Sequence, residues 1–348
     1  MLLYWCLFAF FAIGALSSRD GAQSRESRLG LALGAVLLAV AIGIRYKVGG
    51  DWRSYQTMFN RSALYDLVGM MRFGDPAYQL LNWLVNWLDW PFWVVNLVCG
   101  GIFSWGLLRF ANAQLNPWLA MVVAVPYLVI VVAMGYTRQA VAIGFIMMGL
   151  AALQRGCSVV RFGFYVLLAA LFHKTAVVAM LLVALTGGRN RIINLMIVAA
   201  SAVLLYDSLL QNSVNNLMQN YAGAKYSSQG AAIRIGLCLL PAAIFFQQRK
   251  WLLFSPKGMA LWRNASVAAV TALIALLVSP SSTAVDRIAL YLLPLQLAVL
   301  SQLPRLFKSR SSGTIAVIAY SGVIQFVWLN YAPNANYWIP YSSYFWKY

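Results

Sequence analysis

Apolar segments long enough to cross a lipid bilayer recur along the whole chain, with short polar connections between most of them. A helix needs about 20 mostly apolar residues to span the hydrocarbon core. Of the 348 residues, 62% are hydrophobic and 10% are charged, and the mean hydropathy is +0.72. Soluble domains carry about 25% charged residues. The sequence therefore predicts an all-α polytopic integral membrane protein, with residues 1–348 forming a single transmembrane domain.

Hydropathy predicts about 12 membrane crossings. The first crossing lacks a basic start and a convincing cleavage site, so we expect it to be a retained helix rather than a signal peptide. The predicted crossings are Met1 to Leu16, Leu29 to Ile44, Pro91 to Leu108, Pro117 to Gly135, Gln139 to Leu153, Phe162 to Phe172, Thr175 to Thr186, Ile192 to Tyr206, Ala231 to Phe246, Ala265 to Val278, Arg287 to Leu303 and Thr314 to Leu329.

The charges predict the orientation of these crossings. With the N-terminus outside, more than half of the 26 Lys and Arg residues fall on the inner side, and most of the eight acidic residues fall outside. This asymmetry follows the positive-inside rule and places both termini outside. The inner residues are Arg19, Arg25, Arg28, Arg109, Arg155, Arg161, Arg189, Arg191, Arg249, Lys250, Lys257, Arg263, Arg305, Lys308 and Arg310, and the outer acidic ones are Asp51, Asp66, Asp75, Asp89, Asp207 and Asp286.

The segment from Phe162 to Thr186 has two interpretations, one helix or two short helices that meet at His173-Lys174. A single helix would move Arg189, Arg191 and a later basic cluster to the outside, so the split is favoured. His173 and Lys174 then lie below the outer surface, where polar groups need protein or a water-filled cavity beside them. We therefore expect short broken helices around an external-facing cavity.

Two further outer segments are predicted. The loop 45–90 contains Ala77 to Asp89, which is too short to span a bilayer and suits an amphipathic helix at the outer interface. The aromatic C-terminal tail, 331–348, fits either part of a saccharide groove or a membrane anchor.

Arginines at the outer ends of separate helices are candidate ligands for an anion. Arg138, Arg234 and Arg287 occupy such positions, and Arg45 lies in the outer loop. A guanidinium group matches phosphate oxygens bidentately, although any one of these arginines also fits a contact with lipid headgroups. Nucleic acid is not an expected partner, because the basic residues are scattered between apolar segments. No metal site is predicted, because the cysteines are far apart and the chain has one histidine.

Several short motifs resemble those of the EpsG family, which comprises Wzy-like exopolysaccharide polymerases. The first is Arg45-Tyr46-Lys47-Val48-Gly49-Gly50-Asp51-Trp52-Arg53-Ser54-Tyr55. The others follow in order along nearly the whole chain and are Asp75-Pro76-Ala77-Tyr78, Tyr136-Thr137-Arg138-Gln139, Phe172-His173-Lys174-Thr175, Asp286-Arg287-Ile288-Ala289-Leu290-Tyr291 and Trp338-Ile339-Pro340-Tyr341.

The resemblance implies a Wzy-like or GT-C-like fold and a multi-pass protein of the bacterial inner (plasma) membrane with both termini periplasmic. The implied activity is that of a metal-independent, cofactor-free glycosyltransferase. It would transfer a growing glycan from undecaprenyl pyrophosphate to the non-reducing end of a lipid-linked repeat unit at the outer face. The implied partners are the undecaprenyl-pyrophosphate-linked oligosaccharide as donor and acceptor, membrane lipid, and a chain-length regulator and a flippase of the same pathway.

Candidate site residues follow from the motifs and the chemistry together. Arg138 and Arg287, with Arg45 and Arg234 behind them, are expected to stabilise the pyrophosphate. The base that takes the acceptor proton is His173 or Asp51. His173 also fits a structural or phosphate-orienting role, and Asp51 also fits a turn or an ion pair in the loop. The predicted substrate-binding residues are Arg45, Tyr55, Asp75, Tyr78, Gln139, Lys174, Arg234 and Tyr291.

Three other functions remain open at this stage. An O-antigen ligase-type glycosyltransferase would use the same arginines with a different acceptor. A lipid-linked oligosaccharide flippase or transporter would need a cationic cavity that opens to both sides, whereas the candidate polar groups gather in the outer half. A structural subunit of an export complex would not need the arginines.

Overall fold

The computed structural model describes residues 1–18, 24–184, 230–278 and 282–346, with the single positions Met196 and Val203. Within these residues the fold is all-helical, as predicted, with one isolated β-bridge between Arg45 and Ser343. The expected crossing Ile192 to Tyr206 and the predicted loop residues Arg19, Arg189, Arg191 and Asp207 lie outside the described residues.

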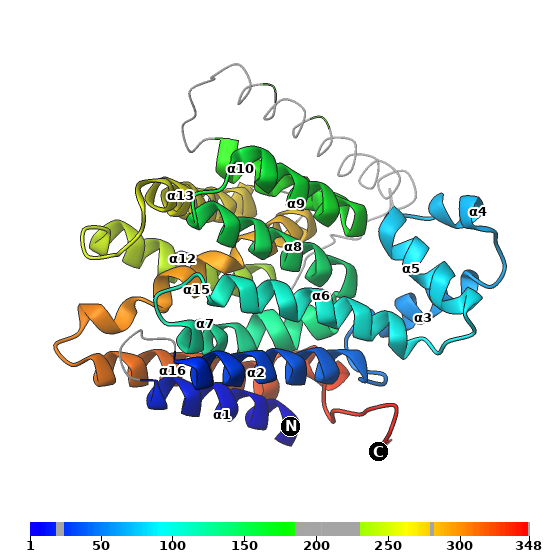
Figure 1. Ribbon diagram of the computed structural model, residues 1–348, viewed down its shortest axis with the longest axis horizontal. Coiled ribbons are helices and arrows are strands. Elements are labelled where there is room, and N and C mark those ends of the chain that lie inside the picture. Colours follow the sequence, from blue (N-terminus) through cyan, green and yellow to red (C-terminus); the bar gives the residue numbers. More distant parts are fainter. Residues whose placement is uncertain (19–23, 185–195, 197–202, 204–229, 279–281, 347–348) are drawn as a thin grey trace.

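Helices stack side by side with their axes roughly aligned, and three short helices project from one end (Figure 1). The longer helices are α1 (Leu2–Ser17), α2 (Arg25–Gly43), α6 (Trp93–Ala111), α8 (Thr137–Gln154), α9 (Val159–Phe172), α12 (Ala231–Gln248), α13 (Pro256–Val278) and α16 (Arg310–Tyr331). The shorter elements are α3 (Trp52–Arg61), α4 (Leu67–Met71), α5 (Pro76–Trp87), α7 (Pro117–Ala124), η1 (Val125–Ala133), η2 (Lys174–Val178), α10 (Ala179–Ala184), α14 (Ser282–Ala289), η3 (Leu290–Leu292), α15 (Leu293–Leu300), η4 (Leu303–Leu306) and η5 (Ala335–Tyr337).

Six described helices are long and apolar enough to cross a membrane, namely α2, α6, α8, α12, α13 and α16. Shorter apolar helical segments cover Leu2–Ser17, Pro117–Ala133, Val159–Phe172 and Lys174–Val183. These elements support a polytopic membrane protein and coincide with predicted crossings. The total of about 12 crossings stays a prediction.

The expected break at His173 is present. Helix α9 ends at Phe172, and His173 adopts an extended backbone with φ −157° and ψ 109° before the 3₁₀ helix η2 begins. Val159 at the start of α9 and Val183 in α10 line the same small cavity, so the chain turns back on itself. The prediction of two short helices is therefore confirmed.

A second irregularity lies in the predicted crossing Pro117 to Gly135. The helix α7 passes into a π-helix, η1, whose second residue is Pro126. Proline has no backbone N–H to continue the α-helical pattern, and π-helical turns are rare and often occur at functional sites. The π-helix ends at Ala133, three residues before Tyr136, which is the N-cap of α8.

The projecting helices α3, α4 and α5 form a cap over one end of the bundle, and both termini lie toward that end (Figure 1). Helix α5 corresponds to the predicted interfacial helix Ala77 to Asp89. A separate cluster of buried residues joins the cap to α6 and α8, and it consists of Trp52, Tyr55, Tyr78, Val85, Phe92, Val95, Cys99 and Val141. The cap is therefore packed against the bundle by its own small core.

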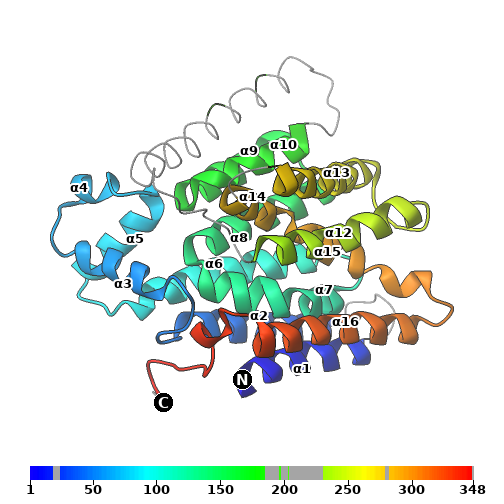
Figure 2. The ribbon, with the colours of Figure 1, turned by 180° about the vertical axis from the view of Figure 1, so that it is seen from behind.

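The C-terminal tail folds back onto the same end of the bundle (Figure 2). Trp338 is 2% exposed, and its indole Nε1–H donates a hydrogen bond of 2.7 Å to the carbonyl oxygen of Ile130 in η1. The hydroxyls of Tyr4 and Tyr341 donate to the carbonyl oxygens of Trp338 and Ala41 at 2.7 and 2.8 Å. The inner part of the tail is therefore part of the packed protein rather than a free anchor.

Candidate functional site

The first turn of α8 connects four separate parts of the structure at the capped end. Four consecutive residues, 136–139, each make a side-chain contact with a different segment. These contacts are Tyr136 with Arg234 of α12, Thr137 with Arg45 of the outer loop, Arg138 with Asp75 at the start of α5, and Gln139 with Arg287 of α14. The start of a helix also carries a partial positive charge and unpaired N–H groups, which favour anions.

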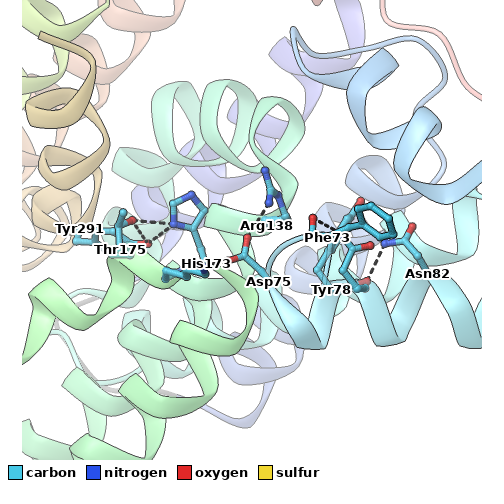
Figure 3. A network of polar contacts seen from close by, with 10 residues as sticks. Phe73, Asp75, Tyr78, Asn82, Arg138, His173, Thr175 and Tyr291 are labelled. Carbon is cyan, nitrogen blue, oxygen red and sulfur yellow. Dashed lines mark hydrogen bonds and ion pairs between the residues drawn. The ribbon is translucent and has the colours of Figure 1, made fainter. Parts of the chain in front are cut away.

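Asp75 joins the cap to the broken helix. One carboxylate oxygen lies 2.7 Å from Nη1 of Arg138, and the other accepts a hydrogen bond of 3.2 Å from the backbone N–H of Lys174 (Figure 3). Burial raises the pKa of the Asp75 carboxyl, whereas the positive charge of Arg138 and the Lys174 N–H lower it. Two charge-assisted contacts thus fix α5, α8 and the break at His173 relative to one another.

His173 belongs to a ring of three side chains on the other side of this contact (Figure 3). Its Nδ1 lies 2.7 Å from Oγ1 of Thr175 and 3.4 Å from the hydroxyl of Tyr291, and these two hydroxyl oxygens are 3.2 Å apart. The two hydroxyls fix the ring's orientation. The second ring nitrogen, Nε2, is the atom that remains for a ligand.

Asp51 lies at the N-cap of α3, near several arginines, and forms no ion pair with the residues that the structure describes. Burial raises the pKa of its carboxyl, and the positive charges of Arg138, Arg287 and Arg234 oppose that rise. Among the described residues, no cation lies within the 4.0 Å ion-pair distance of this carboxylate. A carboxylate that is partly buried and makes no ion pair binds a proton at a higher pH than an exposed carboxylate does.

Tyr55 contacts the start of α8 directly. The guanidinium carbon of Arg138 lies 5.9 Å from the centroid of the Tyr55 ring. Burial raises the pKa of Tyr55 to about 12, so the hydroxyl stays protonated. The rings of Tyr55 and Tyr78 pack edge to face at 5.6 Å and are 4% and 0% exposed. Protein, rather than an open surface, covers these two predicted substrate-binding rings.

Arg45 and Arg234 are far less accessible than Arg138 and Arg287. Arg45 is 1% exposed and donates to the carbonyl oxygen of Ile42 and, at 3.3 and 2.7 Å, to Asn96 Oδ1 and Thr137 Oγ1. Such a buried guanidinium fixes the outer loop against α6 and α8.

Arg234 is 6% exposed, and each of its three nitrogens has a partner in the protein. Its Nε donates to the hydroxyl of Tyr127 at 2.6 Å, Nη2 donates to that of Tyr136 at 2.9 Å, and Nη1 pairs with Asp286. Its charge is therefore balanced inside the protein.

The groups able to meet a ligand are those that remain accessible. Arg287 and Lys174 are exposed, the Arg138 side chain is 26% exposed, and His173 and Asp51 are half-buried. Gln139 and Tyr291 are buried, and they support Arg287 and His173 respectively. The structure thus brings every predicted site residue to one end of the bundle but divides them into accessible groups and buried supports.

Sequence reasoning missed several supporting residues. Thr175 holds His173, Asn96 holds Arg45, and Tyr127 holds Arg234. Asn96 and Tyr127 lie within the predicted crossings Pro91 to Leu108 and Pro117 to Gly135, and a polar side chain in an apolar segment is a signal of a buried partner. Thr175 had no such signal, because its contact depends on the turn at His173.

Comparison with known proteins gives a match to a protein family. The model of the EpsG family matches residues 31–343, which is nearly the whole chain. No curated protein and no solved structure matches the chain.

Proposed function

Because the chain belongs to the EpsG family, which suggests an exopolysaccharide polymerase-type function, we propose that it elongates a polysaccharide at the outer face of the bacterial inner membrane. The donor is the growing glycan on undecaprenyl pyrophosphate. The acceptor is the non-reducing-end hydroxyl of a lipid-linked repeat unit. The single observation that carries this proposal is the convergence of Arg138, Arg287, His173 and Asp51 beside the first turn of α8.

The reaction needs a positive environment for its leaving group. The acceptor oxygen forms a bond to the anomeric carbon, while the bond from that carbon to the pyrophosphate oxygen breaks and its electron pair leaves with undecaprenyl pyrophosphate. Charge develops on that oxygen, and fixed cations in a partly dry site stabilise it. Arg287 and Arg138, together with the N-terminus of α8, supply this environment. The proposed reaction is therefore metal-independent.

The acceptor hydroxyl loses its proton in the same step. We assign the base to Asp51, because its carboxylate is partly buried and makes no ion pair among the described residues. His173, held through Nδ1 by Thr175 and Tyr291, directs Nε2 to a phosphate oxygen or to the acceptor hydroxyl. Asp75 and Tyr55 act as positioning residues, since Asp75 pairs with Arg138 and the Tyr55 ring packs against its guanidinium group.

Deleting the gene in its host tests this function. We expect loss of the polymer and accumulation of single lipid-linked repeat units on the outer leaflet. Units that remain on the inner leaflet would instead identify a flippase. Free polymer that is no longer attached to its final acceptor would identify a ligase, and unchanged polymer would refute all three activities. Complementation with Arg287→Gln, at wild-type abundance, should fail to restore the polymer.

A further inference from the structure

A cavity lies beside Tyr136, and its lining includes none of Arg138, His173 and Asp75. It has a volume of about 410 Å³ and opens between η1, the start of α12, the end of α16 and the C-terminal tail. The side chains used in the argument below are Tyr127, Tyr136, Ile233, Arg234, Trp328 and Asn334. None of the contacts proposed above for the pyrophosphate uses this cavity.

The charge of the cavity distinguishes it from a phosphate site. Arg234 is its one lining side chain with a formal charge among the described residues. All three nitrogens of Arg234 are engaged by Tyr127, Tyr136 and Asp286, and the carboxylate of Asp286 balances the charge. A guanidinium group whose charge is balanced by a buried carboxylate, and whose nitrogens already have partners, binds an added phosphate weakly. The cavity therefore favours an uncharged ligand.

The walls combine aromatic and hydrogen-bonding groups. Tyr136 is half-buried, and its ring lies 5.1 Å from the Arg234 guanidinium carbon, which polarises the ring and fixes its plane. Trp328 packs edge to face on Trp338 at 5.0 Å, and the exposed Asn334 supplies an amide with both donors and an acceptor. Rigid aromatic walls with a few polar groups suit a ligand that has apolar faces and many hydroxyls.

We propose that this cavity is a saccharide subsite, which holds one or two neutral sugar residues of the glycan next to the reacting centre. The proposal rests on the proposed polymerase function. Tyr136 forms one wall of the cavity, and Arg138, which makes one of the proposed pyrophosphate contacts, follows two residues later at the start of α8, so the cavity adjoins the helix end that carries these contacts. The inner part of the C-terminal tail, through Asn334 and Trp338, then contributes to saccharide binding.

Two substitutions on α12 provide the test. Ile233 lines the cavity and is 50% exposed, so Ile233→Trp fills the open volume without replacing a core residue. Leu240 lies on the same helix, is 41% exposed and does not line the cavity, so Leu240→Trp is the matched control. The probe is the phosphate-free oligosaccharide repeat released from the host polymer by mild acid, and its binding to the full-length protein in nanodiscs is measured by titration calorimetry.

We expect Ile233→Trp to weaken binding of this oligosaccharide by at least tenfold, and Leu240→Trp to leave it unchanged. Asn334→Ala should weaken binding by about tenfold or less, as expected for one neutral hydrogen bond. Equal affinity in Ile233→Trp and the wild type would overturn the subsite. The subsite would also be overturned if sugar-free undecaprenyl phosphate competed with the oligosaccharide in the wild type and Ile233→Trp abolished this competition. The cavity would then be a lipid-phosphate site.

Failure of the subsite and failure of the polymerase function give different results. If the wild-type protein binds the oligosaccharide in this cavity but gene deletion leaves the polymer intact, the polymerase function is wrong and the saccharide subsite stands. If deletion abolishes the polymer but the wild-type protein does not bind the oligosaccharide, the subsite is wrong and the function stands.

Discussion

Single residues at the start of α8 divide into those that meet the substrate and those that hold them in place. Arg138 does both, because it is 26% exposed at the side chain and still bonds Asp75 at 2.7 Å. An ammonium group has no planar fork, so it cannot keep the Asp75 contact and also offer paired donors to a pyrophosphate. The identity of this residue therefore matters more than its charge.

We expect Arg138→Lys to lower the polymerisation rate by about 10²-fold, the loss typical of a removed electrostatic contact in a transition state. The measurement is polymer length and amount in the deletion strain complemented with each variant. Membrane abundance must match that of the wild type. A fully active Arg138→Lys enzyme would reduce the role of Arg138 to that of a positive charge.

Asp51 leads to a prediction about pH. Burial raises the pKa of its carboxyl above the ordinary value of 3.8. A base must be ionised, so the rate should fall as the pH drops through this raised pKa, at a higher pH than for an exposed aspartate. Rates of the purified enzyme measured against pH should show this acid limb. Asp51→Asn should be nearly inactive, and an unchanged profile in that variant would move the base to His173.

Asp51→Asn should lower activity but should not lower the stability of the protein. The pKa of Asp51 is higher in the folded protein than in the unfolded chain. The free energy of unfolding therefore falls as the pH rises from the pKa of the unfolded chain to that of the folded protein, because the buried carboxyl must then be ionised. Asp51→Asn removes this cost. We expect its melting temperature at pH 7 to equal or exceed that of the wild type, and a clearly lower value would show that Asp51 holds the loop.

At the scale of helices, close packing of α6 on α8 positions the first turn of α8. A Cβ added to Gly106 of α6 would overlap the carbonyl group of Gly144 of α8, whereas a Cβ on Gly101 of α6 would meet no atom within 4 Å. Small residues allow such backbone contact between membrane helices. The separation of these two helices sets where Arg138 and Gln139 meet their partners.

We expect Gly106→Ala to destabilise the protein by about 1–3 kcal/mol, as overpacking usually does, and to reduce activity. Gly101→Ala on the same helix is the control and should change neither property. Thermal unfolding in detergent and polymer assays in cells measure the two effects. Equal behaviour of the two variants would show that the α6–α8 contact tolerates a larger separation.

At the scale of the whole molecule, the cap α3–α5, both termini and the candidate site lie toward one end of the bundle (Figure 1). Arg305 and Arg310 border a cavity with Leu16 and Asn116, where α1 ends and α7 begins, at the opposite end of these helices. The positive-inside rule predicts that this opposite end lies on the inner side.

Reporter fusions test this orientation. Alkaline phosphatase is active only outside the inner membrane, so a fusion after Trp346 should be active and a fusion after Lys308 should be inactive. A cytoplasmic fluorescent reporter at the same two positions should give the reverse pattern. Activity of the phosphatase at Lys308 would reverse the orientation and place the candidate site inside.

Sequence alone determined the class of the protein and the approximate positions of most of its long apolar helices. A long apolar segment in lipid must form a helix, because no other regular structure satisfies the backbone hydrogen bonds of a single segment there. The charges also predicted the break at His173, because a single helix would have moved Arg189 and Arg191 to the outer side. The motifs around Asp51, Asp75, Arg138 and Arg287 marked the candidate site through their resemblance to those of the EpsG family.

Only the tertiary structure decided which of the candidate residues are accessible. The sequence does not distinguish Arg45 and Arg234 from Arg138 and Arg287. In the structure Arg45 and Arg234 are buried and bonded to other residues. Arg138 and Arg287 remain accessible. Their partners Asn96 and Tyr127 lie in other helices, and Thr175 reaches His173 through a turn. Burial and pairing are properties of helices packed in three dimensions, and a one-dimensional pattern carries the residue types but not the contacts between distant segments.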